Sequence, residues 1–446
     1  MSIIVGIVIG TAIFKTPTLV LQNVSSEWQS HMLWLLGGGL SLCGALCYAE
    51  LATSLSRNGG EYVYLSKAYA PWLGFLFGWA QMTVVHSGTV GSMGYAFADY
   101  AMRIWTFPEW ANAWLAAGAI VLLTVLNLIG ATAGKWVQNL LSSVKVLGLL
   151  GVIVAGFAAP ANVETHGASG GVVTPSLGLA LVFVLYAYGG WNDSAYVATE
   201  VQNRERNLPR ALLVGLAGIT LIYLLVNLAC LRVLGIDAAR QTLTPAADVV
   251  ERALGTAGRR AVSLLVMISA LGAINGMIFT GARVYGVMSQ DHRLFARLGP
   301  SHARLGAPVF ALIAPCLFSF LLILGVGTSF GQSFIDRLLG LIGVPELPWE
   351  EYFGGFETLV AGTAPVFWSF FLLSGIAVFV LRWREPNLDR PFRIPCYPVP
   401  AVIFCVVCGY MLFSSVAYAR WLSLLGFAPL AAGVPLIGWI RKGRQS

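Results

Sequence analysis

The sequence is poor in charge and in the residues that usually build catalytic or metal centres. Only 11% of its 446 residues are charged, against about 25% in ordinary globular proteins, while 57% are hydrophobic, against roughly 45–50%. This balance excludes a soluble fold. The five histidines show no metal-ligand spacing, and the seven cysteines lie in or beside apolar segments. We therefore expect no metal site, no cofactor and no disulfide framework.

Other absences narrow the functional class. The apolar segments hold no Ser/His/Asp arrangement and no paired aspartates, which disfavours a membrane-embedded enzyme. The apolar stretch at Met1 has no basic region before it, so we expect no cleavable signal peptide. The net charge is +7, and most of the basic residues lie in the loops between apolar segments. This distribution indicates membrane topology and not nucleic-acid binding.

Long apolar windows are what the sequence does contain. A helix needs about 20 apolar residues to cross the hydrocarbon core, and windows of that length predict an all-α integral membrane protein of twelve spans. Placing the N-terminus in the cytoplasm puts most of the 27 Lys and Arg residues on the inner side, so both termini are expected there. The predicted spans are 2–22, 32–55, 71–102, 112–131, 137–158, 175–200, 208–231, 259–289, 307–326, 358–382, 396–416 and 420–440.

Two polar intervals on the predicted outer side separate these spans. Residues 236–257 mix apolar and charged positions in the pattern of a helix lying at the membrane interface. Residues 327–357 hold five acidic residues among Pro, Gly and Trp, and we expect them to form a solvated loop.

Two of the predicted spans are interrupted by helix-breaking residues. The first carries Gly10, Thr11 and Ala12 near its middle with a proline soon after, and the sixth carries a glycine pair followed by Asn192 and Asp193. A single glycine in a span usually serves close packing, but this second cluster is too polar for that role. Matching breaks that each open a block of five spans indicate an inverted-repeat transporter, with repeats at 1–158 and 175–382 and two further helices within 396–440.

The broken helices predict what the site binds. A half-helix beginning near Thr11 points free N–H groups and a positive dipole end into the cavity, which suits a carboxylate. Half-helices ending near Val8 and near Tyr186 leave free carbonyl groups, which suit an ammonium group. A carboxylate beside an ammonium group describes an α-amino acid.

Four stretches resemble one known family along essentially the whole chain. They are Gly10–Phe14, then Cys47–Leu51 with Gly59–Tyr64, then Tyr188–Asn192 with Thr199–Glu200 and Arg206–Arg210, and Asn275–Gly276 with Phe279–Thr280 and Arg283. Together they resemble the amino acid–polyamine–organocation superfamily, and within it the bacterial relatives of the L-type amino acid transporters.

This resemblance implies a LeuT-type fold of five plus five inverted helices and two more, working by alternating access. By position, the backbone N–H groups of Thr11 and Ala12 would hold the substrate carboxylate, in the loop that begins at Gly10. The amine would be held by three carbonyl groups, with Asn192 nearby and with Tyr186 at the position of an outer gate. Those carbonyl groups belong to Val8, Tyr186 and Gly189.

The chain departs from the family pattern at three places. Ala12 replaces a glycine of the carboxylate loop, which restricts the backbone there. Asp193 stands where L-type members have an aromatic residue, so side-chain selectivity does not carry over. The segment 103–111 has no cysteine, whereas animal members use one there to bond a glycoprotein. No disulfide-linked glycoprotein partner is therefore expected, and a bacterial inner membrane is the expected location.

Ionisable residues inside spans cost at least about 2.5–3.5 kcal/mol, so each requires an explanation. Lys145 lies where sodium-independent members of the family place a lysine in the sodium site. It would replace the cation or carry a proton, and the alternative is a lysine that reaches the cytoplasmic surface. Asp193 either meets a cationic side chain or titrates, or it caps the half-helix that starts there. Glu50 either joins a gating ion-pair network or is an ordinary interfacial charge.

These observations predict a sodium-independent amino acid transporter of the lipid bilayer, working by exchange or by proton symport. An amine or polyamine transporter of the same fold is the alternative. It would need carboxylates in the cavity to replace the lost carboxylate contact, and Asp193 is the candidate. A channel is disfavoured because facing broken helices form an occluded site and not a continuous pore.

Overall fold

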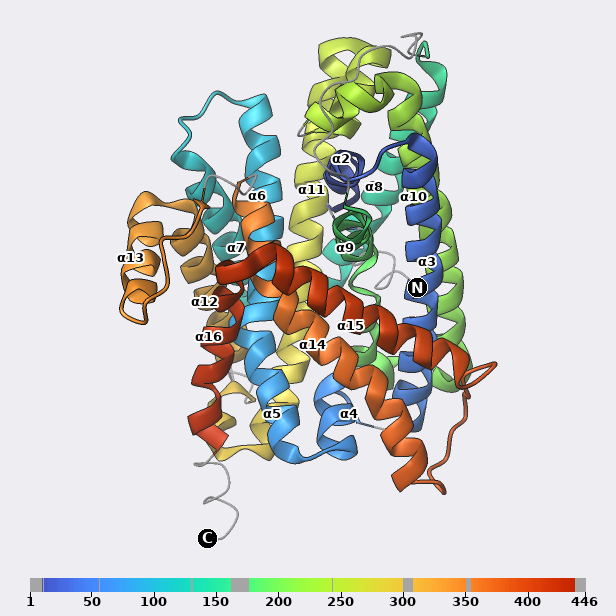
Figure 1. Ribbon diagram of the computed structural model, residues 1–446, viewed down its shortest axis with the longest axis vertical. Coiled ribbons are helices and arrows are strands. Elements are labelled where there is room, and N and C mark those ends of the chain that lie inside the picture. The colour runs from blue at the N-terminus through green and yellow to red at the C-terminus, as the bar shows by residue number, and fades with distance from the viewer. Residues whose placement is uncertain are drawn as a thin grey trace.

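The computed structural model describes residues 10, 12–55, 57–129, 131–161, 176–242, 244–299, 308–349 and 354–437. Every regular element in these ranges is a helix (Figure 1). In chain order they are η1 (Ala12–Phe14), α2 (Thr16–Gln22), α3 (Glu27–Ser54), α4 (Glu61–Ala68), α5 (Pro71–Ala80), the π-helical η2 (Gln81–Val85), α6 (His86–Ile104), α7 (Ala111–Ile129), α8 (Ala131–Ala158), α9 (Leu177–Tyr188), η3 (Trp191–Glu200), α10 (Arg204–Gln241), α11 (Pro245–Asp291), η4 (Arg293–Leu298), α12 (Val309–Gly327), α13 (Ser329–Gly340), α14 (Gly355–Arg384), α15 (Val399–Ala419), η6 (Arg420–Ser423) and α16 (Leu424–Ala432).

Seven helical stretches of the described residues are long and apolar enough to cross a membrane. The protein is therefore an all-helical membrane protein, as the composition predicts. The stretches are Glu27–Ser54, Ala111–Ile129, Arg204–Gln241, Pro245–Asp291, Val309–Gly327, Gly355–Arg384 and Val399–Ile437. The last of them joins the predicted spans 396–416 and 420–440.

Three of the other four predicted spans are not single α-helices of that length. The span predicted at 71–102 is divided by the π-helical turn η2 between α5 and α6. The first and sixth predicted spans are interrupted, and the structure describes the first only from Gly10 onward, apart from position 11. The remaining one, predicted at 137–158, lies within the single helix α8, Ala131–Ala158.

The interruptions fall at the residues that the sequence singled out. Helix α9 ends at Tyr188, the chain turns at Gly189 and Gly190, and it continues as the 3-10 helix η3. Gly190 has a φ of +99°, a conformation that glycine adopts without the steric cost of a Cβ atom. In the first predicted span, a short 3-10 turn precedes α2, and Pro17 lies in the first turn of that helix, where its missing N–H costs nothing.

The polar interval at 236–257 is largely helical, as the sequence predicts, and the interval at 327–357 is more helical than predicted. Within residues 236–257, helix α10 runs to Gln241 and helix α11 begins at Pro245. Gly255, with a φ of +68°, kinks α11 between its amphipathic start and its apolar body. Within residues 327–357, which we expected to be a loop, α13 forms because Thr328 caps its N-terminus through the amide of Gly331.

Close helix packing fixes the broken helix α9 in the middle of the bundle (Figure 1). A Cβ atom added to Gly37 on α3 would lie 2.3 Å from the Val184 side chain of α9, so only glycine allows this approach. At the end of α9, the Tyr188 hydroxyl donates to the Trp34 carbonyl at 3.0 Å. The Tyr223 ring of α10 packs against both side chains. Helix α9 is thereby held on two sides while its end faces inward.

Candidate functional site

A cavity lies beside the break between α9 and η3. It encloses about 100 Å³, where one water needs only about 10–15 Å³ on a comparable measure. Its walls come from η1, η2, α6, α9, η3, α11 and α14. The lining residues are Gly10, Ala12, Gln81, Val85, His86, Thr89, Met93, Val182, Leu185, Tyr186, Ala187, Gly189, Gly190, Asn192, Asp193, Ala273, Met277, Val360, Thr363, Ala364, Phe367 and Trp368.

Six of the site residues expected from the sequence line this one cavity, although they come from two distant parts of the chain. They are Gly10, Ala12, Tyr186, Gly189, Asn192 and Asp193. Val8 and Thr11 lie outside the described residues. The tertiary fold therefore brings the first break and the sixth-span break to the same cavity, which is the juxtaposition that an inverted repeat requires.

The end of α9 offers carbonyl oxygens to the cavity wall. The Tyr186 carbonyl accepts the Gly189 amide at 3.0 Å, and the Ala187 carbonyl accepts the Tyr223 hydroxyl at 3.1 Å. A carbonyl oxygen has two lone pairs, so the Tyr186 oxygen keeps the capacity for one more donor. The C-terminal end of a helix also carries partial negative charge. A cationic group, such as an ammonium, is the ligand that suits this end.

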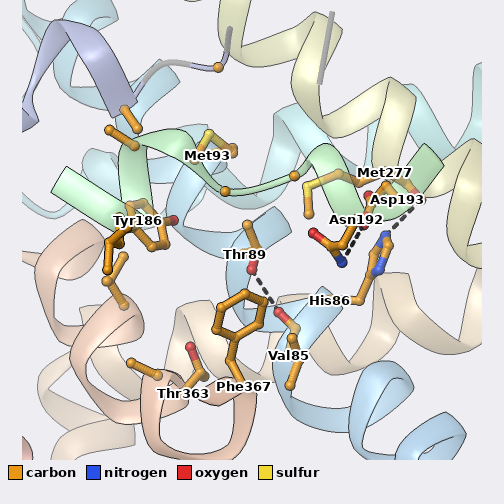
Figure 2. A pocket seen from close by; sticks show the side chains of 18 of the residues that line it. Val85, His86, Thr89, Met93, Tyr186, Asn192, Asp193, Met277, Thr363 and Phe367 are labelled. Atoms are coloured by element: carbon orange, nitrogen blue, oxygen red, sulfur yellow. Dashed lines mark hydrogen bonds between the residues drawn. The ribbon is translucent and has the colours of Figure 1, made fainter. Parts of the chain in front are cut away.

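The cavity has polar groups at both ends and mostly apolar side walls. Figure 2 shows Asn192, Asp193 and His86 at one end and Tyr186 at the other, with Thr89 between them. The Tyr186 hydroxyl lies 3.1 Å from the Ser92 hydroxyl, and its ring packs edge-on against Phe356 at 6.0 Å. A polar ligand that enters is thus oriented by the two ends and surrounded by apolar side walls.

Tyr186 is covered by a charged layer that the sequence did not reveal. Lys15, which follows η1, pairs with Asp99 on α6 and lies 5.0 Å from the centroid of the Phe356 ring. Asp99 also accepts a hydrogen bond from the Asn112 amide at 2.7 Å. The Lys15 side chain is 10% exposed and that of Asp99 is 33% exposed, so the lysine is mostly buried and its partner is half-buried. The layer joins the first broken helix to α6 and α14 above the tyrosine end of the cavity.

A second carboxylate lies behind the opposite end, next to Asn192, and the sequence reasoning used it only as part of a motif. Glu61, at the start of α4, is fully buried and accepts hydrogen bonds from Tyr48 at 3.0 Å and from Asn192 at 3.2 Å. Asn192 donates at 3.2 Å to Asp193 as well. The Gly-Gly-Glu sequence at 59–61 was the available signal, because Gly60 has a φ of +52° and begins the helix that carries Glu61.

Comparison with known proteins agrees with this geometry. The family model described as amino acid permease matches residues 1–430, nearly the whole chain. The chain belongs to the amino acid permease family. It is therefore an integral membrane transporter of amino acids and not an enzyme.

Curated relatives of the permease cover almost all of its length. The b(0,+)-type amino acid transporter 1 of Mus musculus is 28% identical over 94% of this chain and 82% of its own. The cystine/glutamate transporter of Homo sapiens is 28% identical over 99% of this chain and 85% of its own. The serine/threonine exchanger SteT of Bacillus subtilis (strain 168) is 26% identical over 100% of this chain and 96% of its own.

Lys145 does not line the cavity of the permease. It lies on α8 with 0% of its surface exposed, so it does not reach a surface as the alternative of a snorkelling lysine requires. Helix α8 packs against α10 and α11, and α11 contributes Ala273 and Met277 to the cavity. Among the described residues, Lys145 therefore lies near a helix that lines the cavity and is not itself part of the lining.

The permease offers no metal site within the residues that the structure describes. No group of three His, Cys, Asp or Glu side chains converges there. All seven cysteines are free, and the exposed one is Cys396.

Asp193 accepts hydrogen bonds from two side chains, the Asn192 amide at 3.2 Å and the Thr280 hydroxyl at 3.4 Å.

Proposed function

We propose that the permease carries zwitterionic amino acids across the membrane without sodium, by alternating access. The observation that carries this proposal is the convergence of Gly10 and Ala12 with the end of α9 on one cavity. The carboxylate would lie at the N–H groups of Thr11 and Ala12. The ammonium group would lie at the carbonyl groups of Val8, Tyr186 and Gly189, with Asn192 beside them.

The inverted-repeat architecture is part of the same proposal. Repeats at 1–158 and 175–382, followed by two helices within 396–440, would place the two broken helices face to face, and the shared cavity supports this arrangement. Tyr186, packed on Phe356, would close the cavity on the side of Lys15. The location proposed is a bacterial inner membrane with both termini cytoplasmic, and no disulfide-linked partner is required.

Lys145 is proposed to take the place of a sodium ion. Its ammonium group would supply the positive charge that a bound sodium ion supplies in sodium-dependent transporters. The complete burial of Lys145 between packed helices supports this role. Transport would then proceed equally in sodium and in potassium media. Because a relative that spans the whole chain is an exchanger by name, exchange of external for internal amino acid is the first mode to test.

Counterflow in proteoliposomes tests this function. Vesicles holding the purified permease are preloaded with one amino acid at a time, and uptake of labelled amino acid is measured in sodium and in potassium. We expect counterflow for at least one zwitterionic amino acid at equal rates in both media. Counterflow with amines alone would assign the polyamine class, and strict sodium dependence would contradict the role of Lys145.

Two lysine variants compare the loss of a buried lysine with the loss of an exposed one. We expect Lys145→Ala to lower counterflow at least tenfold, because a buried group that fixes helix positions is lost. The control is Lys67→Ala, which removes a lysine whose side chain is 46% exposed and pairs with Glu385. That variant should keep wild-type counterflow, since exposed ion pairs contribute about 0–1 kcal/mol.

A further inference from the structure

Two buried carboxylates meet beside the end of the cavity where Asp193 lines the wall, and Glu61 lies there behind Asn192. Glu61 on α4 is 0% exposed, and Asp193 on η3 is 5% exposed. The amide of Asn192 lies between them, and its Nδ2 atom donates to Glu61 Oε1 and to Asp193 Oδ1, at 3.2 Å in both cases. Because one amide group serves both acids, the two carboxylates form a single unit.

Within the described residues, the hydrogen-bond partners of this unit are neutral groups. None of the ion pairs in the described part of the chain includes Glu61 or Asp193. Their other hydrogen bonds within the described residues come from the hydroxyls of Tyr48 at 3.0 Å and Thr280 at 3.4 Å, and the Tyr196 hydroxyl also interacts with Glu61. Two adjacent buried negative charges without a cation are very unfavourable, whereas a bound proton removes one of them.

Among the described residues, two buried oxygen atoms at the carboxylate pair have no hydrogen-bond partner of ordinary geometry, which is consistent with a proton bound to one carboxyl group. Glu61 Oε2 is buried and accepts no hydrogen bond of ordinary geometry, and the Tyr196 hydroxyl that interacts with this carboxylate is a neutral group. The hydroxyl of Tyr285 on α11, which is electrostatically coupled to Asp193, is also buried without a partner. A neutral carboxyl group at this position needs fewer donors than a carboxylate does, which matches the donors present.

The groups around the pair do not replace the proton. Among the described residues, the titratable side chains that face the pair are four tyrosines and one histidine. Gln81 on η2 is neutral and donates to the Tyr196 hydroxyl at 3.3 Å. His86 on α6 places Nε2 2.7 Å from the Met277 carbonyl. Arg204 on α10 interacts electrostatically with the Tyr64 hydroxyl. The four tyrosines are Tyr48 on α3, Tyr64 on α4, Tyr196 on η3 and Tyr285 on α11.

We propose that Glu61 and Asp193, joined by Asn192, bind one proton that crosses the membrane together with the amino acid. This inference rests on the proposed amino acid transport and extends it to the coupling ion. Asp193 lines the cavity, so water in an open cavity can deliver the proton. Closure around the substrate removes that water, which favours the protonated form and sends the proton in the same direction as the substrate.

Accumulation driven by a pH gradient tests the coupling. Proteoliposomes in potassium medium, with the membrane potential clamped, receive an amino acid that shows counterflow and an outer pH one unit more acidic than the lumen. For one proton per amino acid we expect about tenfold accumulation at equilibrium, since one pH unit is a factor of ten in proton activity. A dye inside the vesicles should report acidification that follows uptake.

Isosteric variants locate the proton. Glu61→Gln and Asp193→Asn should reduce the tenfold accumulation to near onefold. The matched control is Glu357→Gln, which alters a buried carboxylate on α14 whose partner is Tyr418, and it should accumulate as the wild type does. Loss of accumulation in His86→Gln, with Glu61→Gln and Asp193→Asn unchanged, would move the proton to the histidine and overturn the proposal.

A measurement on the unmodified protein covers the case in which the variants do not fold. In weakly buffered detergent solution, adding the amino acid should cause net uptake of protons by the wild-type permease, and the absence of uptake would overturn the proposal. Counterflow without any response to pH would overturn the coupling alone. Absence of counterflow for all amino acids would refute the transport function itself, so the two failures are distinguishable.

Discussion

The ion-pair network at Glu50 provides the sharpest stability test. The Glu50 carboxylate is 3% exposed and accepts hydrogen bonds from Arg382 Nε at 2.8 Å, from Arg382 Nη2 at 2.6 Å and from the Ile394 amide at 2.8 Å. Arg390 lies 3.7 Å from the same carboxylate. The network thereby ties the end of α3 to α14 and to the segment that follows α14.

Removal of the carboxylate should destabilise the fold strongly. Breaking a buried pair by deleting one partner costs about 3–5 kcal/mol, and because the Arg382 side chain is 23% exposed we expect Glu50→Ala to cost about 3 kcal/mol. Arg382→Lys keeps the charge but loses the two-pronged contact, so about 1 kcal/mol is expected. Unfolding in mixed micelles measures both, and the double variant should cost about 1 kcal/mol less than the sum.

An exposed pair serves as the control for this network. Arg57 pairs with Asp291 at 2.8 Å, and its side chain is 45% exposed. Arg57→Ala should therefore cost less than about 1 kcal/mol. If Glu50→Ala costs no more than Arg57→Ala, or if the double variant is strictly additive, the network does not hold α3 to α14 and the reasoning is refuted.

Three further predictions concern the cavity. Gly190→Ala forces a Cβ onto a φ of +99°, at a cost of about 1–3 kcal/mol, and should weaken amino acid binding at least fivefold, whereas Gly218→Ala, in open space on α10, should not. Lys15→Met and Asp99→Asn should each speed substrate dissociation by up to about fivefold, because a pair worth about 1 kcal/mol covers the cavity, and equal rates in wild type and variants would contradict this. Tyr186→Phe keeps the aromatic contact and loses only the hydroxyl contact with Ser92, so KM should change less than about threefold, and a tenfold change would show that the hydroxyl binds substrate.

The sequence by itself determined the class of the protein and the places where its helices break. Long apolar runs identify membrane helices because hydrocarbon leaves no other partner for backbone N–H and C=O groups. For the same reason the polar cluster after Tyr188 could be identified as a break, and α9 does end there. The predicted boundaries failed where amphipathic helices such as α13 lie outside long apolar windows, since hydropathy alone does not detect a capped polar helix.

Only the tertiary structure decided which polar residues meet. Glu61 reaches Asn192 across 131 positions, and Lys15 reaches Asp99 across 84. Hydrophobic periodicity reports the neighbours that a residue has along its own helix, but such pairs depend on how different helices pack. The burial of Lys145 also follows from helix packing, because a lysine at that depth of a helix faces either protein or membrane surface with the same local sequence. The chemistry of the cavity therefore arises from helix packing, although each residue involved lies at a break or charge visible in the sequence.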